Sequence, residues 1–224
     1  APGLTSDMKV KVGSLHGTSW GAYPERLESQ PSWFDRAGKR LVSPFLRLAK
    51  TQSVQQRSFV RAVASHAKWA GNLTEGKIRE EAAELGLQLR EHGFTNPLVS
   101  RCFSLIRESA ERTLGKRHFD VQLIGGRLML SGMVAEMETG EGKTLAATLP
   151  AATAALAGIP VHVITVNDYL TDRDAQWMGP IYRMLGLTVG TIVHGLEPAQ
   201  RRAAYNAHVT YCTNKEVAFD YLKD

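Results

Sequence analysis

The run Thr-Gly-Glu-Gly-Lys-Thr at residues 139–144 constrains the fold of this chain more than any other feature of its sequence. Glycines let successive backbone N–H groups turn toward a bound phosphate, and a larger side chain would block that approach. We expect Lys143 to reach the β- and γ-phosphate oxygens and the hydroxyl of Thr144 to bind Mg²⁺. The run therefore predicts a phosphate-binding loop and, with it, an α/β nucleotide-binding fold.

The residues on either side of the loop agree with this prediction. The longer form of the motif has a glycine where this chain has Met137, so only the shorter form Thr-Gly-x-Gly-Lys-Thr is met. Residues 132–137 predict a short buried strand before the loop, and residues 145–156 predict a helix after it. A helix that begins at the loop would direct the partial positive charge of its N-terminus at the same phosphates.

Beyond the loop, the predicted strands and helices alternate. We expect strands at residues 161–166, 187–193 and 208–212, and helices at residues 172–185, 198–206 and 216–222. Such alternation is typical of a parallel sheet with crossover helices, whose ligands lie at the carboxyl ends of the strands. The first strand consists mostly of β-branched residues, which predicts that both of its faces are covered.

The chain before the loop divides into an irregular arm, residues 1–50, and a region of helices, residues 51–116. In the helical region, Asn96 is expected to cap a helix whose first turn contains Pro97. Further helices are predicted at residues 75–91 and 121–130. The second of these contains Gly125-Gly126, and each glycine costs a helix about 1 kcal/mol relative to alanine. We therefore expect another backbone to approach this helix closely.

Composition excludes some classes of protein without choosing among the rest. The 224 residues, 43% of them apolar and 22% charged, are typical of a soluble globular protein. No apolar stretch approaches the roughly 18 to 20 residues that a bilayer span needs. The net charge of +5 is compatible with anionic lipid or nucleic acid and decides neither. Cys102 and Cys212 lack metal-ligand spacing, so we expect buried free thiols.

Gln122 is a candidate for recognition of the nucleotide base. It lies eighteen residues before Gly140, within the string His-Phe-Asp-Val-Gln at residues 118–122. A glutamine amide offers one acceptor and two donor hydrogens, which suit the N6 and N7 edge of adenine. Helicase-like ATPases place such a glutamine just upstream of the phosphate loop, so the spacing favours adenine recognition over an ordinary surface glutamine.

At these residues the sequence resembles a known family. The strings at residues 117–126 and 135–144 are similar to the start of the motor domain and the phosphate loop of SecA, the family of bacterial preprotein translocase ATPases. The resemblance continues through residues 163–174 and ends with residues 211–222. It is dense over residues 117–224 and looser over residues 60–116. It implies a P-loop NTPase of the helicase superfamily 2 type, with residues 117–224 forming part of a DEAD-like motor domain.

The resemblance also implies a function. Members of the family are ATP-driven motors that push unfolded preproteins through a protein-conducting channel, as peripheral proteins at the cytoplasmic face of the cytoplasmic membrane. ATP and Mg²⁺ are the implied cofactors, anionic lipid and a homodimer are compatible with the family, and nucleic acid is not expected. Carried over by position, Gln122 would bind adenine, and the phosphates and Mg²⁺ would be held by Gly140, Glu141, Gly142, Lys143 and Thr144, the last two being the catalytic candidates.

Catalysis needs an acidic pair on a strand, which holds Mg²⁺ and orients water. The last acidic residues here, Glu216, Asp220 and Asp224, do not form one, and the family's pair follows shortly after the point where this sequence ends. We therefore expect an N-terminal part of a longer protein, which alone binds nucleotide without turning it over. A superfamily 2 helicase fragment and a non-catalytic nucleotide-binding module are the alternatives.

The sequence departs from the family pattern at five positions, which are Glu138, Cys212, Lys215, Val217 and Ala218. These departures leave open whether the protein is a main translocase or an accessory paralogue.

Overall fold

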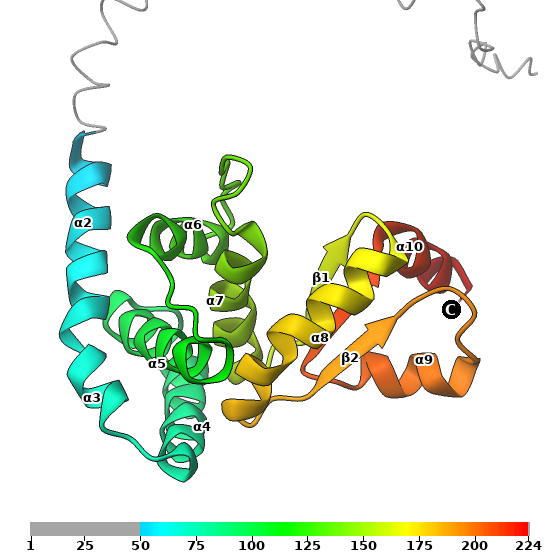
Figure 1. Ribbon diagram of the computed structural model, residues 1–224, viewed down its shortest axis with the longest axis horizontal. Coiled ribbons are helices and arrows are strands. Elements are labelled where there is room, and N and C mark those ends of the chain that lie inside the picture. The colour runs from blue at the N-terminus through cyan, green and yellow to red at the C-terminus, as the bar shows by residue number, and fades with distance from the viewer. Residues whose placement is uncertain (1–49, 224) are drawn as a thin grey trace, which may run out of the picture. The chain divides into compact units, whose positions relative to one another are not determined.

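The computed structural model describes residues 50–223, so the predicted irregular arm lies, but for Lys50, outside the described residues. The described part begins with helices and continues with alternating strands and helices (Figure 1). In chain order its elements are α2 Lys50–Ser65, α3 Ala67–Gly71, α4 Glu75–His92, α5 Asn96–Leu114, α6 Asp120–Leu130, α7 Lys143–Leu156, β1 Val161–Thr165, α8 Asp168–Met184, β2 Val189–Ile192, α9 Pro198–Tyr205, β3 Val209–Thr213 and α10 Asn214–Lys223. None of these helices combines the length and apolar character needed to cross a bilayer.

The strands form one parallel sheet in the order β1-β3-β2. Val161 of β1 and Val189 of β2 both pair with Val209 of the central strand β3. Every residue of β3 is buried, as expected for a strand with a neighbour on each side and helices on both faces. The parallel sheet with helical crossovers confirms the predicted α/β class, and each predicted strand after the loop exists within a few residues of its predicted bounds.

Two neighbouring residues of β3 show how the helices cover this sheet. The hydroxyl of Thr210 donates to the carbonyl of Ala204 in α9 at 2.8 Å. The hydroxyl of Tyr211 lies 3.2 Å from that of Tyr182 in α8. Because successive side chains of a strand point to opposite faces, α8 and α9 lie on opposite sides of the sheet.

The prediction that β1 is covered on both faces is wrong. Its burial alternates, and Ile164 is 55% exposed on the face that carries His162. On that face Tyr205 of α9 reaches as far as the ring of His162, with 5.5 Å between ring centroids. A β-branched run indicates a strand, but it does not say how far a helix extends over it.

The predicted strand at residues 132–137 is also wrong. Gly132 has φ +76 and forms a turn, and the side chain of Val134 is 96% exposed. The segment leaves α6 as part of the loop that leads to α7 (Figure 1). A parallel strand requires a hydrogen-bonded neighbour, and among residues 50–223 no strand pairs with this segment.

The main core joins the N-terminal helices to the sheet. Buried apolar side chains from α2, α4, α5, α7, α8 and β3 form one cluster. At one end of it Phe59 of α2 packs edge-on against Phe103 of α5, with ring centroids 5.4 Å apart. Cys102 lies in this cluster, and Cys212 is buried in β3, so the prediction of two buried free thiols is confirmed.

Two local predictions in the helical region need correction. The residue that caps α5 is Thr95, whereas Asn96 is the first residue of the helix and accepts hydrogen bonds from Arg127 at 3.1 and 2.8 Å. The glycine pair of α6 is approached by side chains rather than by a backbone. A Cβ at Gly126 would lie 2.9 Å from the Cβ of Leu149 in α7. The prediction that another segment approaches α6 closely is confirmed, but the prediction that this segment is a backbone is wrong.

Candidate nucleotide-binding site

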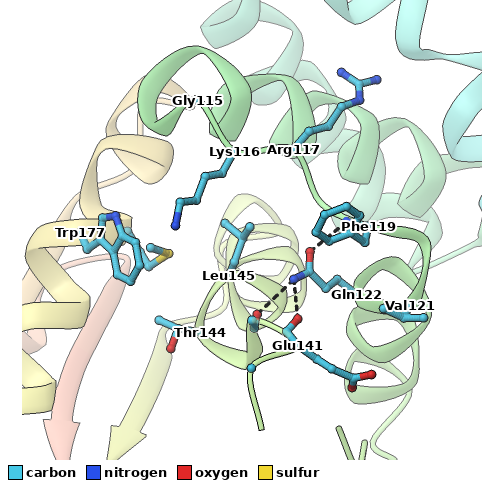
Figure 2. A pocket seen from close by; sticks show the side chains of 13 residues that line it. Gly115, Lys116, Arg117, Phe119, Val121, Gln122, Glu141, Thr144, Leu145 and Trp177 are labelled. Carbon is cyan, nitrogen blue, oxygen red and sulfur yellow. Dashed lines mark hydrogen bonds between the residues drawn. The ribbon is translucent and has the colours of Figure 1, made fainter. Parts of the chain in front are cut away.

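A cavity of about 670 Å³ opens beside the first turn of α7, a volume in the range of small-molecule sites. Its walls come from the segment between α5 and α6, the loop before α7, and α8 (Figure 2). The lining residues are Gly115, Lys116, Arg117, Phe119, Val121, Gln122, Gly140, Glu141, Gly142, Thr144, Leu145, Trp177 and Met178. Five of the six predicted site residues therefore line one cavity, although the sequence separates Gln122 from the loop.

The loop has the backbone conformation that its glycines allow. Gly140 has φ +94 and Gly142 has φ +77, values in the left-handed region that other residues avoid. At Gly142 there is also no space, because an added Cβ would lie 2.4 Å from Nε2 of Gln122. The structure therefore explains the glycine at each position: both need a positive φ, and Gly142 also has no space for a side chain.

The N-terminus of α7 has backbone donors without partners. Helix α7 has no side-chain cap, and its first N–H with a partner is that of Ala146, which donates to the carbonyl of Gly142 at 3.0 Å. Within the described part of the chain, the N–H groups of Lys143, Thr144 and Leu145 make no backbone hydrogen bond. Free N–H groups and the helix dipole together form a site for an anion.

Gln122 is 2% exposed, and both ends of its amide are engaged. Its Oε1 accepts the N–H of Phe119 at 2.9 Å, and its Nε2 donates to the carbonyl of Glu141 at 2.7 Å and more weakly to that of Gly142 at 3.4 Å (Figure 2). These partners fix which end of the amide is oxygen. The side chain thus ties the segment before α6 to the phosphate loop, and one lone pair of Oε1 is left for a ligand.

Among the predicted loop residues, Glu141 has the least to offer a ligand through its polar groups. Its carboxylate accepts the N–H of Glu138 at 2.8 Å, and its own N–H donates to the carbonyl of Glu138 at 3.3 Å. Figure 2 shows its side chain directed away from Thr144 and Trp177. Glu141 therefore stabilises the turn of the loop from within.

Lys143 and Thr144, in contrast, are available. Lys143 is exposed, and within the described residues it forms no ion pair. The side chain of Thr144 lines the cavity (Figure 2). Both side chains begin in the first turn of α7, beside the unpaired N–H groups, so a cation, a hydroxyl and a helix N-terminus meet at one place.

Sequence reasoning missed Lys116 and Trp177, which face each other across the cavity. The ammonium of Lys116 lies 4.4 Å from the ring centroid of Trp177, a cation–π contact between the α5–α6 segment and α8 (Figure 2). Lys116 directly precedes the string at residues 117–126, so its position could have drawn attention. Trp177 carried no sequence signal, because its place at the cavity depends on how α8 packs.

The fold and the site together define a class of protein. A glycine-rich loop followed by an uncapped helix N-terminus, on a parallel α/β sheet, is the arrangement of P-loop nucleotide-binding proteins. The family of the SecA DEAD-like domain matches residues 43–224. This chain belongs to the SecA family.

Three relatives illustrate the range of similarity. The chain is 49% identical to protein translocase subunit SecA 2 of Bordetella avium (strain 197N), over 90% of its own length. It is 45% identical to SecA 3 of Magnetococcus marinus over 94% of its length, and 56% identical to SecA of Desulforamulus reducens over 68%. These matches cover 31%, 32% and 17% of the respective relatives. The chain thus spans a third or less of each of these relatives.

Proposed function

We propose that this chain is the ATP-binding part of a SecA-type motor, which couples ATP hydrolysis to the translocation of preproteins across the cytoplasmic membrane. One observation carries the nucleotide-binding part of the proposal: α7 begins at the edge of a cavity with three N–H groups that have no partner among residues 50–223, next to two glycines with positive φ. Membership of the SecA family supports ATP as the nucleotide.

In this proposal the predicted residues bind different parts of the nucleotide. Lys143 and the first N–H groups of α7 bind the phosphates, while Gln122 meets adenine through the remaining lone pair of its Oε1. Gly140 and Gly142 give the loop its shape, and Glu141 stabilises its turn.

The residues present also fit Mg²⁺ in part. Thr144 lines the cavity, and Mg²⁺ binds a hydroxyl oxygen such as that of Thr144 together with water and phosphate oxygens. Bound there, the ion would neutralise charge on the phosphates.

We further propose that this chain by itself binds ATP without turnover. Within residues 50–223 no group of three or more His, Cys, Asp or Glu side chains is placed to hold a metal ion. The buried carboxylate of Glu216 and that of Asp220 both pair with Arg201, away from the cavity. An acid that orients the attacking water would then come from outside the described residues.

The partners follow from the names of the relatives, which are protein translocase subunits. We propose a membrane protein-conducting channel and unfolded preproteins as the partners of the whole protein, at the inner face of the cytoplasmic membrane, and we include contact with anionic lipid and a homodimer. Residues 166–169, after β1, carry the acidic Asp168, and residues 213–215, at the end of β3, add a single cation, Lys215. These segments offer little positive charge to bind the phosphates of a nucleic acid, so we propose no nucleic-acid partner.

Titration calorimetry tests the nucleotide-binding proposal. The 224-residue chain should bind Mg·ADP and Mg·ATP, and Lys143→Ala should weaken ADP binding at least tenfold, because a direct charge–phosphate contact is lost. Lys77→Ala, on the exposed surface of α4, is the matched control and should bind as the wild type does. ATP should survive incubation with the chain. Wild-type-like binding by Lys143→Ala, or turnover that Lys143→Ala abolishes, would contradict the respective part of the proposal.

A further inference from the structure

His118, in the α5–α6 segment, is completely buried, and its side chain contacts α7. Its Nε2 lies 3.0 Å from the carbonyl oxygen of Leu145 and 3.2 Å from the hydroxyl oxygen of Thr148. The hydroxyl of Thr148 donates its own hydrogen to the carbonyl of Leu145 at 2.6 Å. Both neighbours of Nε2 are therefore acceptors, so Nε2 carries the proton and Nδ1 has the lone pair.

Nδ1, on the other side of the ring, needs a hydrogen-bond donor. Among residues 50–223, neither the buried Nδ1 of His118 nor the buried Nε of Arg107 in α5 has a hydrogen-bond partner. The two atoms are complementary, since Nδ1 accepts and the Nε–H of an arginine donates. Leaving a buried polar atom unpaired costs about 1 to 3 kcal/mol, and buried water commonly satisfies such atoms.

The place of His118 in the chain gives this contact a role at the site. Leu145 directly follows Thr144 and lines the cavity, whereas His118 directly precedes Phe119, whose N–H is held by Gln122. The imidazole thus joins the first turn of α7, where phosphate is expected, to the segment that carries the base-side residues. No other side chain within the described residues donates to the carbonyl of Leu145 except Thr148 of the same helix.

We propose that His118 is a positioning residue of the nucleotide site: its Nε2–H holds the first turn of α7 against the α5–α6 segment. This inference rests on the proposed nucleotide binding. The charged group that acts on the ring is Arg107 of α5. Arg107 in turn is influenced by Arg117 of the α5–α6 segment, by Asp120 of α6 at 3.9 Å and by Glu111 of α5. The residues that α7 presents to the ring, Leu145 and Thr148, are uncharged.

Two substitutions separate this role from general packing. In His118→Gln the amide nitrogen can take the place of Nε2 and donate to Leu145, whereas in His118→Asn the shorter amide reaches only the position of Nδ1. Calorimetry with Mg·ADP on the 224-residue chain should show affinity within about threefold of the wild type for His118→Gln and a loss of about tenfold for His118→Asn. The same pair of changes at His92, an exposed residue at the end of α4, serves as the control and should have no effect.

The outcomes separate this inference from the proposal beneath it. If the wild type does not bind Mg·ADP, the nucleotide site itself is refuted. If the wild type binds and His118→Asn binds equally well, or if Gln and Asn lose affinity equally, only the positioning role is refuted. Imidazole ¹⁵N shifts of the wild type provide a test that needs no variant. They should report a neutral ring protonated at Nε2, and protonation at Nδ1 would overturn the inference even where both variants fail to fold.

Discussion

The amide of Gln122 connects the two sides of the nucleotide cavity, because it donates to the carbonyl of Glu141 at 2.7 Å and accepts the N–H of Phe119 at 2.9 Å. A residue expected to recognise the base is therefore also a structural support of the phosphate loop. Any change at Gln122 should disturb both functions together.

Replacing Gln122 with glutamate keeps the shape of the side chain and removes its donor. A carboxylate would face the carbonyl oxygens of Glu141 and Gly142 without a hydrogen to share, so Gln122→Glu should weaken Mg·ADP binding at least tenfold and lower the Tm. Calorimetry measures the affinity and differential scanning calorimetry the Tm. Gln55→Glu, on the exposed side of α2, is the control. Unchanged affinity and Tm in Gln122→Glu would show that these hydrogen bonds do not hold the loop.

The two loop glycines should differ in their tolerance of alanine. Both have positive φ, which costs an L-residue roughly 1 to 2 kcal/mol. A Cβ at Gly140 would meet nothing within 4 Å, whereas one at Gly142 would lie 2.4 Å from Nε2 of Gln122. Thermal unfolding should therefore show a larger loss of stability for Gly142→Ala than for Gly140→Ala. Equal losses would mean that Gln122 moves aside freely.

These residues also show what the sequence could predict. The helix that follows the loop and the strands after it depend on local patterns, and the structure confirms them. The prediction for residues 132–137 failed because a strand needs a partner that is distant in the sequence, and no local pattern reveals whether that partner is present. In the same way, Gln122 was found by its spacing, but its hydrogen bonds to Glu141 depend on packing between α6 and the loop.

The pKa of His118 makes a further prediction about stability. Burial lowers this pKa from 6.5 to about 4, against the raising effect of the hydrogen bond to Leu145 and with a further lowering by Arg107. Between these two values the unfolded chain binds a proton that the folded chain does not, so stability rises with pH across the window and is lost as the pH falls through it. The full loss for such a shift is of the order of 3 kcal/mol.

The pH dependence of the Tm measures this effect. From pH 7 to pH 4 the wild type should lose more stability than His118→Gln, which has no group to protonate at this position. The carboxylates of Glu216 and Asp220, whose pKa values are lowered beside Arg201, contribute equally to both proteins. Parallel curves for the two proteins would show that His118 titrates normally.

The two thiols should be unreactive in the folded chain. Burial raises the pKa of Cys102 to about 12 and also raises that of Cys212, with Asp220 adding to the effect there. Because the thiolate is the nucleophile, a maleimide at pH 7.5 should label neither residue in the native chain and both in guanidinium chloride. Mass spectrometry counts the labels. Rapid labelling of either thiol in the native chain would contradict its burial.

The central claim is that the first N–H groups of α7 bind phosphate, and amide NMR tests it most directly. In ¹H–¹⁵N spectra of the 224-residue chain, Mg·ADP should shift the amides of Lys143, Thr144 and Leu145 downfield, and by more than any amide of α9 or α10. Those three N–H groups have no partner among the described residues, and they become hydrogen-bonded when the ligand binds. Binding that leaves these amides unshifted, or that shifts mainly the region around Arg201 and Lys215, would contradict the account.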